Sequence, residues 1–201
     1  EQYRNLLHTI IPADTTSSSY DFYIQSINTC HQSILSDKKG AYKTIIDTAS
    51  SCLTLPASSF DRLMKQLPVY CIDSEMSGIY EPYRSTSVCY ITKSKSTPLP
   101  SLNIYIDNQL YYIHLKTLLL PIQRLPTPLS GRGHRLCIHR GYDINEEEHV
   151  TNTIIFGALV LKNFYISFHL QDKSLLLSNK LIYDKNSQEY QLMNISYIQC
   201  A

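Results

Sequence analysis

Tryptophan is absent from this sequence, glycine occurs only six times, and the net charge is close to zero. With 18 basic and 17 acidic side chains, the formal charge of +1 supplies no overall field to recruit nucleic acid or an anionic membrane surface. The longest apolar run, residues 154–161, has eight residues even when Gly157 is counted, whereas a helix needs roughly 20 to span a bilayer. We therefore expect no nucleic-acid partner and no membrane span in this chain.

The sequence also lacks a Cys-x-x-Cys pair, which argues against a zinc ribbon. An even number of cysteines without that spacing favours three disulfides formed in an oxidising compartment. The triplet Asn194-Ile195-Ser196 is an acceptor for N-glycosylation and agrees with such a compartment. The sequence therefore predicts a protein of the secretory pathway, either extracellular or in a vacuolar, lysosomal or other secretory organelle. Its six cysteines are Cys30, Cys52, Cys71, Cys89, Cys137 and Cys200.

The residues that are abundant favour β-strands, with 16 tyrosines beside many isoleucines, threonines, serines and leucines. Apolar and β-branched patterns predict strands over 20–27, 43–46 and 52–55. Alternation on both sides of Asp107-Asn108 predicts a hairpin over 101–115, because this dipeptide suits a tight turn. The length is ordinary for a single β-rich domain. We expect one all-β domain.

Two regions depart from the strand pattern and predict short helices. After Pro56 the apolar residues take the i, i+3, i+4, i+7 spacing of an amphipathic helix, at Phe60, Leu63, Met64 and Leu67. Residues 150–170 predict a buried strand, a turn at Gly157, one helical turn around 161–163 and another strand. The expected fold class is thus all-β with one or two short helices.

The stretch IIDTASSCLTLP, residues 45–56, holds Asp47 between two segments that both favour burial. An aspartate in this position either caps a turn or is held out of bulk water for proton chemistry. Small hydroxyl residues follow Asp47, and then come an apolar strand, a proline and the predicted helix. Much later in the chain a pair of isoleucines leads into Phe156-Gly157.

This order resembles the carboxy-terminal lobe of the pepsin-like aspartic peptidases, the family of pepsin, cathepsin D, beta-secretase and the plasmepsins. In that family each lobe carries an apolar-apolar-Asp-Thr/Ser-Gly-Thr/Ser turn, which a later apolar-apolar-Gly strand crosses. The resemblance extends over residues 7–177 through the ordered motifs LLHTIIPA, YDFYIQSI, IIDTASSCLTLPASSFDRLMKQL, LPSLNIYIDNQLYYIHLKTLLL and NTIIFGALVLKNFYISFHLQDKSLLL. It implies one lobe of a bilobal acid-protease fold, with an interlobe linker over 1–19, the lobe over 20–180 and a carboxy-terminal extension over 181–201.

The resemblance also implies roles for the residues of the turn. Asp47 would be one of two catalytic aspartates, Thr48 would reach the partner lobe, and Ser50 would hydrogen-bond the outer oxygen of Asp47. Ala49 and Ser51 would lie where the substrate binds. Two carboxylates in contact cannot both ionise readily, so they share a proton, activate a water and polarise the peptide carbonyl. The implied activity is hydrolysis of peptide bonds in a peptide or protein substrate, without a cofactor or a metal.

One catalytic motif is not enough for this mechanism, because a pepsin-like site needs two aspartates. No other aspartate of the chain has the flanking pattern. The expected partner is therefore an amino-terminal lobe of the same protease that is absent from this chain. A retroviral-type homodimer would also supply two aspartates, but its subunits are much shorter.

Departures from the family pattern leave a second function open. Ala49 stands where the family has a glycine whose amide bonds the carboxylate. Gly157 is followed by Ala158 where many members have aspartate, and Phe168-His169 replaces a Phe-Asp pair. The alternative is a catalytically inactive pepsin-fold protein that binds or inhibits a partner.

The resemblance implies a disulfide pairing as well. Many members bridge the cysteines that correspond to Cys89 and Cys137, and comparison with beta-secretase implies Cys30 with Cys200, and with it Cys52 with Cys71. The residues alone leave every pairing open. A separate group with short spacing suits zinc, but the resemblance favours a solvated loop with a disulfide cysteine there. This group consists of His134, Cys137, His139 and His149.

Overall fold

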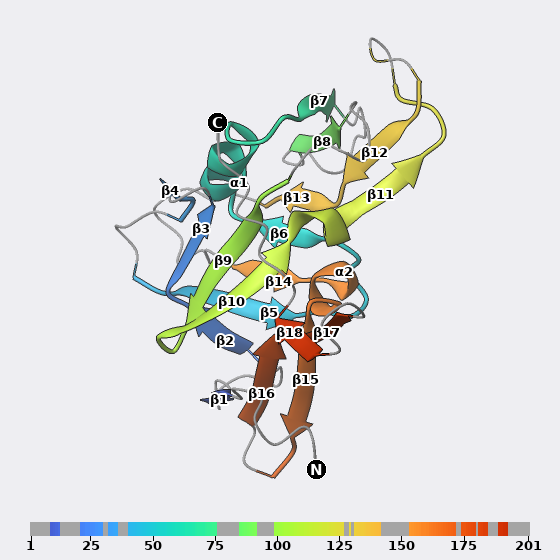
Figure 1. Ribbon diagram of the computed structural model, residues 1–201. Coiled ribbons are helices and arrows are strands. Elements are labelled where there is room, and N and C mark those ends of the chain that lie inside the picture. Colours follow the sequence, from blue (N-terminus) through green and yellow to red (C-terminus); the bar gives the residue numbers. More distant parts are fainter. Residues whose placement is uncertain are drawn as a thin grey trace, which may run out of the picture.

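The computed structural model describes residues 9–12, 21–29, 32–35, 40–75, 85–91, 99–126, 129, 131–141, 153–171, 174–179, 181–184 and 189–192. Within these residues the secondary structure is mainly β-strand, with two α-helices and one 3-10 turn (Figure 1). The prediction of an all-β fold with one or two short helices is confirmed. No helix in this part of the chain is long and apolar enough to cross a membrane.

The largest sheet has five strands in the order β13-β6-β14-β5-β2. β14 lies between β5, to which it is parallel, and β6, to which it is antiparallel. Because β5 and β6 follow each other in the chain, the segment that joins them must pass over the end of β14. The Phe156 ring of β14 meets that of Phe22 edge to face at 5.8 Å in the core. The five strands are β2 (Asp21–Ile24), β5 (Tyr42–Ile46), β6 (Leu53–Leu55), β13 (Ile138–Arg140) and β14 (Ile154–Phe156).

The strand predicted over 20–27 is in fact two strands that belong to different sheets. β2 pairs with β5, whereas β3 (Ser26–Thr29) pairs with β9 (Ser101–Ile106). Gln25 lies between them, and its backbone N–H donates a hydrogen bond to the Tyr105 carbonyl at 2.9 Å. Alternation in a sequence shows which face of a strand is buried but not which strand is its partner. The change of sheet therefore has no local signal.

The hairpin predicted around Asp107-Asn108 is confirmed. β9 and β10 (Gln109–His114) are antiparallel neighbours, and Asp107 and Asn108 have φ of 47° and 60°. Positive φ at both central residues agrees with a type I′ turn, which aspartate and asparagine tolerate. With β3 and β4 (Gln32–Ser33) this hairpin forms a sheet of order β10-β9-β3-β4.

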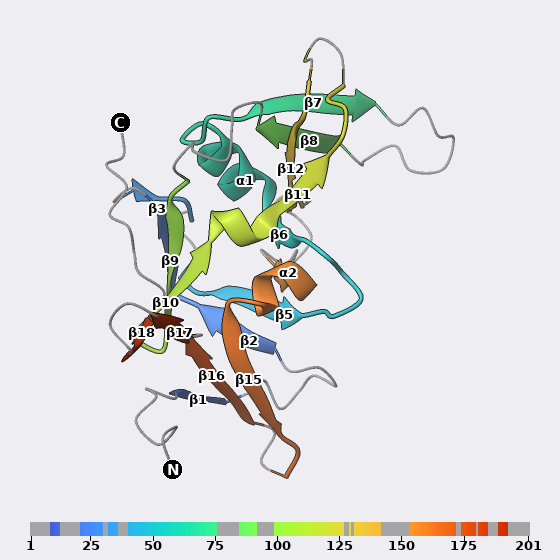
Figure 2. The same cartoon turned by 45° about the vertical axis from the view of Figure 1, so that its right-hand side comes forward.

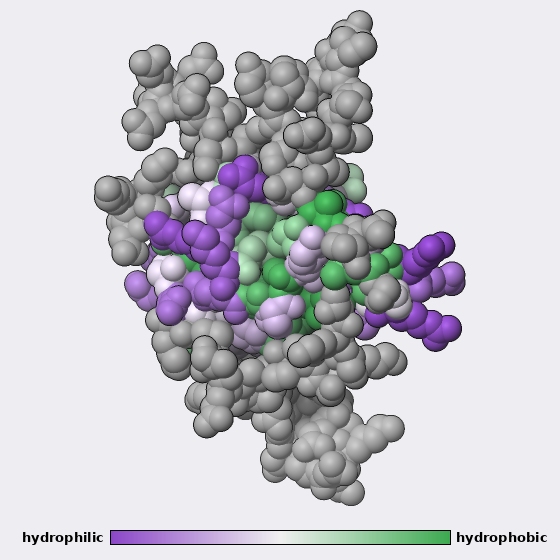
Figure 3. All heavy atoms as spheres, turned by 90° about the horizontal axis from the view of Figure 1, so that it is seen from above, coloured by the Kyte–Doolittle hydropathy of each residue, from purple (hydrophilic) through white to green (hydrophobic). Residues whose placement is uncertain are grey.

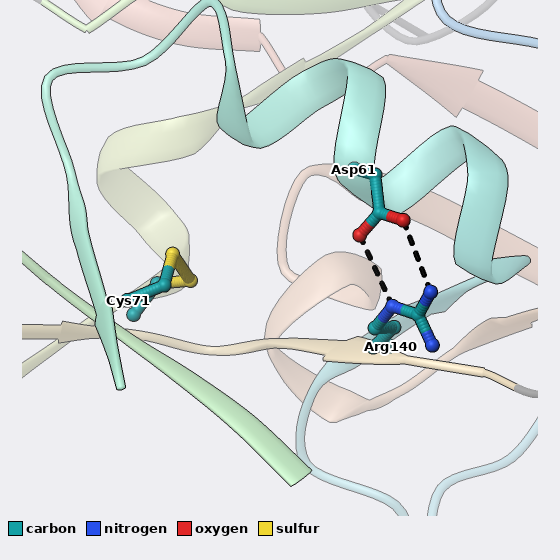
Figure 4. The surroundings of a disulfide bond; sticks show 4 residues. Asp61, Cys71 and Arg140 are labelled. Atoms are coloured by element: carbon teal, nitrogen blue, oxygen red, sulfur yellow. Dashed lines mark hydrogen bonds and ion pairs between the residues drawn. A yellow bond between two sulfur atoms is a disulfide. The ribbon is translucent and has the colours of Figure 1, made fainter. Parts of the chain in front are cut away.

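α1 (Ala57–Met64) is the helix predicted after Pro56. Phe60 and Leu63 are buried, and burial of each side chain stabilises the fold by about 2–3 kcal/mol. On another face of α1, the Asp61 carboxylate accepts two hydrogen bonds from the Arg140 guanidinium of β13, both at 3.0 Å (Figure 4). This two-point contact joins the helix to β13, an edge strand of the five-stranded sheet.

Within the described residues, the remaining strands form three sheets, two of which lie at the two ends of the molecule. Figures 1 and 2 show β15 and β16 at one end and β7, β8 and β12 at the other, with β5, β6 and β14 between them. From the end of β7 and β8, apolar residues lie in the middle of the face, with hydrophilic residues to the left and right of them (Figure 3). One sheet comprises β7 (Tyr70–Glu75), β8 (Ser85–Ile91), β11 (Leu119–Ile122) and β12 (Gly133–Leu136). The others comprise β1 (Thr9–Pro12), β15 (Phe164–His169) and β16 (Ser174–Asn179), and the pair β17 (Leu181–Asp184) and β18 (Glu189–Leu192).

Two disulfides link the four cysteines that the structure describes, and the pairing predicted for them is wrong. Cys71 is bonded to Cys89, and Cys52 is bonded to Cys137 (Figure 4 shows the first bond at Cys71). Cys71 and Cys89 lie opposite each other in the register of β7 and β8, with Cα atoms 4.0 Å apart. Cys52 and Cys137 directly precede the paired parallel strands β6 and β13, and their Cα atoms are 4.8 Å apart. Strand register thus decides both pairings.

Three predictions about covalent modification and metal binding concern residues outside those that the structure describes. These are the Cys30–Cys200 bond, glycosylation at Asn194 and a zinc ligand at His149. The sulfur of Cys137 is bonded to another sulfur and is not a thiolate ligand. Within the part of the chain that the structure describes, no group of three or more His, Cys, Asp or Glu side chains is placed to hold a metal ion.

Candidate active site

The candidate catalytic aspartate begins the turn that joins β5 to β6. The amide of Asp47 donates to the Phe156 carbonyl of β14 at 3.1 Å. Its side-chain Oδ1 accepts the amide of Ala49 at 2.9 Å, so the carboxylate folds back over its own turn. Asp47 is half-buried, whereas Thr48 and Ala49 are exposed. The carboxylate is therefore held by a backbone donor and remains accessible to a ligand.

The chain that continues from β14 crosses directly beneath this turn. Three successive amides donate to three carbonyls of the turn: Gly157 to Cys52 at 3.1 Å, Ala158 to Ser50 at 2.8 Å, and Leu159 to Ser51 at 3.0 Å. Backbone bonds of this kind satisfy polar groups that would otherwise be buried without a partner. The turn is thus supported along most of its length by backbone rather than by mobile side chains.

Gly157 lies too close to the turn for any side chain. A Cβ atom built on it would lie 2.7 Å from both the Cys52 nitrogen and the Ser51 carbonyl carbon, and closer still to the Cys52 oxygen. The φ of Gly157 is −80°, so glycine is required here for space and not for a left-handed backbone. The Ile-Ile-Phe-Gly motif therefore marks the crossing point.

Ala49 fits the turn although the family pattern has glycine at this position. Among the non-glycine residues that the structure describes, only Asp107 and Asn108 have positive φ. Ala49 thus has a backbone conformation that an L-residue adopts readily. Its amide still donates to Asp47, and the residue is exposed. The substitution leaves this contact to the carboxylate intact.

The crossing segment continues into α2 (Ala158–Leu161), one turn earlier than the helical turn predicted around 161–163. Asn163, which is 5% exposed, anchors the end of α2. Its Nδ2 donates to the Val160 carbonyl and to Thr117 Oγ1, both at 2.9 Å, and its Oδ1 accepts the His114 amide at 3.1 Å. Thr117 belongs to the 3-10 turn η2 (Leu115–Leu118), so Asn163 joins α2 to η2. This network is not predicted from the sequence, where its one local signal is a polar residue between apolar stretches.

Asp47 and Ala49 are the predicted site residues that the structure brings into direct contact. Thr48 and Ser51 are exposed on the same turn, and Ser50 is half-buried. The roles predicted for these three residues, toward a partner lobe, the carboxylate and the substrate, remain predictions. All five residues nevertheless lie on one connected segment above β14.

His114 is expected to make the protein less stable in acid. Its Nδ1 lies 2.9 Å from Ser101 Oγ, and partial burial, followed by the charge of Lys116, lowers its pKa. The unfolded chain therefore binds the proton more readily than the folded chain does. The associated stability is fully present above the ordinary histidine pKa of about 6.5 and is lost as pH falls from there through the lowered value. We expect the variant His114→Gln to lose less stability over this interval, as measured by urea denaturation across pH. Equal pH slopes for variant and parent would contradict this expectation.

Comparisons with known proteins bear on this geometry. The profile of the eukaryotic aspartyl protease family matches residues 2–180. Among solved structures, the chain is similar to the aspartic proteinase from Irpex lacteus, with a TM-score of 0.60 and 18% sequence identity. That match covers 96% of this chain and 49% of the proteinase, so this chain spans about half the length of the proteinase. A comparison with curated proteins found no match.

Proposed function

Because the chain belongs to the eukaryotic aspartyl protease family, we propose that it is the carboxy-terminal half of an aspartic endopeptidase in which Asp47 is a catalytic carboxylate. One observation carries the proposal. The Asp47 turn receives the Ala49 amide on its carboxylate and rests on three amides of the crossing segment. Such an arrangement presents an acid group in a fixed position without enclosing it.

The proposed chemistry requires a second carboxylate from an amino-terminal lobe. The two groups share one proton, so that the ionised member activates a water and the protonated member polarises the scissile carbonyl. The exposed Thr48 would contact that lobe, Ser50 would support Asp47, and Ala49 and Ser51 would contact the peptide backbone. The match to about half of a solved proteinase supports this division. The two disulfides support folding in the secretory pathway.

The proposal is tested with the full-length protein that contains this chain. A peptide library is incubated with it at acidic pH, with and without a statine-type inhibitor, and the products are identified by mass spectrometry. We expect internal peptide bonds to be cut and the inhibitor to block cleavage. Absence of cleavage by a folded protein that contains both lobes would overturn the proposal.

The substitution Ala49→Gly distinguishes between two functions of this protein, an active endopeptidase and an inactive binding protein. The Ala49 amide already donates to Asp47, so glycine adds no new contact. We expect kcat/KM to stay close to that of the parent, and the free energy of unfolding to fall by about 0.4–1 kcal/mol because glycine loses more entropy on folding. Kinetics and urea denaturation provide the two measurements. An inactive parent that becomes active in the glycine variant would show instead that the methyl group blocks the site.

A further inference from the structure

The turn that carries Asp47 ends at a residue that is held in two ways. Cys52 is 4% exposed and directly precedes β6. Its carbonyl accepts the amide of Gly157 at 3.1 Å, and its sulfur is bonded to Cys137. Backbone and side chain of Cys52 therefore connect the end of the turn to two different parts of the core.

Cys137 passes this connection on to the 3-10 turn η2. Its side chain is fully buried, and its amide donates to the Leu118 carbonyl of η2 at 2.8 Å. The Cys137 carbonyl accepts the amide of Leu53, the residue after Cys52, at 3.2 Å. η2 also contains Thr117, which is bonded to Asn163 at the end of α2.

These links close a ring beneath the candidate catalytic turn. The ring runs from Cys52 through the disulfide to Cys137, through η2 and Asn163 into α2, and back to Cys52 through Gly157. The other links between separate segments of the ring are hydrogen bonds, which can open locally, whereas the disulfide is covalent. Without the disulfide, the end of the turn would keep only its hydrogen bonds and its continuation into the buried strand β6.

The second disulfide provides a contrast within the same chain. Cys71 and Cys89 join β7 to β8, two neighbouring strands that are already paired over six positions. These strands lie at the end of the molecule beyond α1, away from β5 and β14 (Figures 1 and 2). This bond therefore adds a cross-link to a hairpin without touching the turn.

We propose that the Cys52–Cys137 disulfide is a positioning element for Asp47 that keeps its carboxylate aligned with the reacting groups. The proposal rests on the proposed endopeptidase function. Misplacement of a reacting group by about 1 Å can cost on the order of 100-fold in rate. A loosened turn is therefore expected to lower kcat more than it raises KM, since the rest of the substrate site is unchanged.

The test compares two double variants of the full-length protein, each at temperatures where it is fully folded. For Cys52→Ala/Cys137→Ala we expect kcat to fall about 10- to 100-fold while KM changes by less than about threefold. For the matched control Cys71→Ala/Cys89→Ala we expect both constants to stay near those of the parent. An unchanged kcat in the first variant, or an equal fall in both, would overturn the proposal while leaving the endopeptidase function intact.

Hydrogen exchange supplies a measurement that does not depend on activity. The amides of Ala49, Ala158 and Leu159 should exchange at least about tenfold faster in Cys52→Ala/Cys137→Ala than in the control variant, because they bond the loosened turn. If the parent cleaves no peptide, the proposed function fails and the exchange rates alone decide whether the disulfide positions the turn. Equal exchange at these amides would overturn it. Should the alanine pair fail to fold, Cys52→Val/Cys137→Ala refills part of the space without restoring the bond.

Discussion

Asp47→Asn is expected to lower the kcat of the full-length protein for peptide cleavage at least about a thousandfold and to leave its fold unchanged. Asparagine has nearly the same shape as aspartate and keeps an oxygen that can accept the Ala49 amide, now made at 2.9 Å. It cannot ionise, and so it can neither activate a water nor share a proton with a second carboxylate. The measurements are kcat and KM on a cleaved peptide, together with thermal denaturation.

A matched control is available on α1. Asp61→Asn makes the same chemical change at a carboxylate that faces Arg140 rather than the candidate site. This ion pair is partly exposed, so its loss should lower the free energy of unfolding by no more than about 1 kcal/mol and leave kcat unchanged. Activity that survives in Asp47→Asn, or that is lost equally in Asp61→Asn, would remove Asp47 from the mechanism.

Local patterns predict those parts of the fold whose cause is local. The Asp107-Asn108 turn is one example, because its positive φ values suit these two residues wherever the strands lie. α1 is another, because its apolar spacing shows the buried face without reference to a partner. The crossing of the Asp47 turn by the Gly157 segment has no local cause, and it is predicted only because the resemblance supplies the long-range pairing.

The features that the sequence could not predict depend on how the strands align with one another. The disulfide partners follow from the alignment of β6 with β13 and of β7 with β8, and nothing in the spacing of the cysteines specifies either. The break at Gln25 arises because β2 and β3 pair with different strands. Asn163 acquires its role only because α2 packs beside η2. Composition carries no signal for any of these contacts.

Apart from Asp47→Asn, Gly157→Ala is expected to be the single substitution that most reduces peptide cleavage, because it also destabilises the fold. The added Cβ would lie 2.7 Å from the Cys52 nitrogen, and its nearest neighbours are backbone atoms of the turn, which cannot move aside by a change of rotamer. Overpacking of this kind costs about 1–3 kcal/mol, and the displaced segment also weakens the three hydrogen bonds that it donates to the turn. We expect the free energy of unfolding to fall by about 3 kcal/mol or more, with loss of peptide cleavage in the molecules that still fold.

Gly40→Ala separates lack of space from backbone strain. Gly40 has a φ of +67° and no atom within 4 Å of a built Cβ, the opposite situation to that of Gly157. Alanine there should cost only about 1–2 kcal/mol of left-handed strain and leave cleavage unaffected. Urea denaturation and kinetics of both variants measure the difference. If Gly157→Ala were as stable and as active as Gly40→Ala, the segment after β14 would have room to withdraw from the turn, and Asp47 would not depend on that segment for its position.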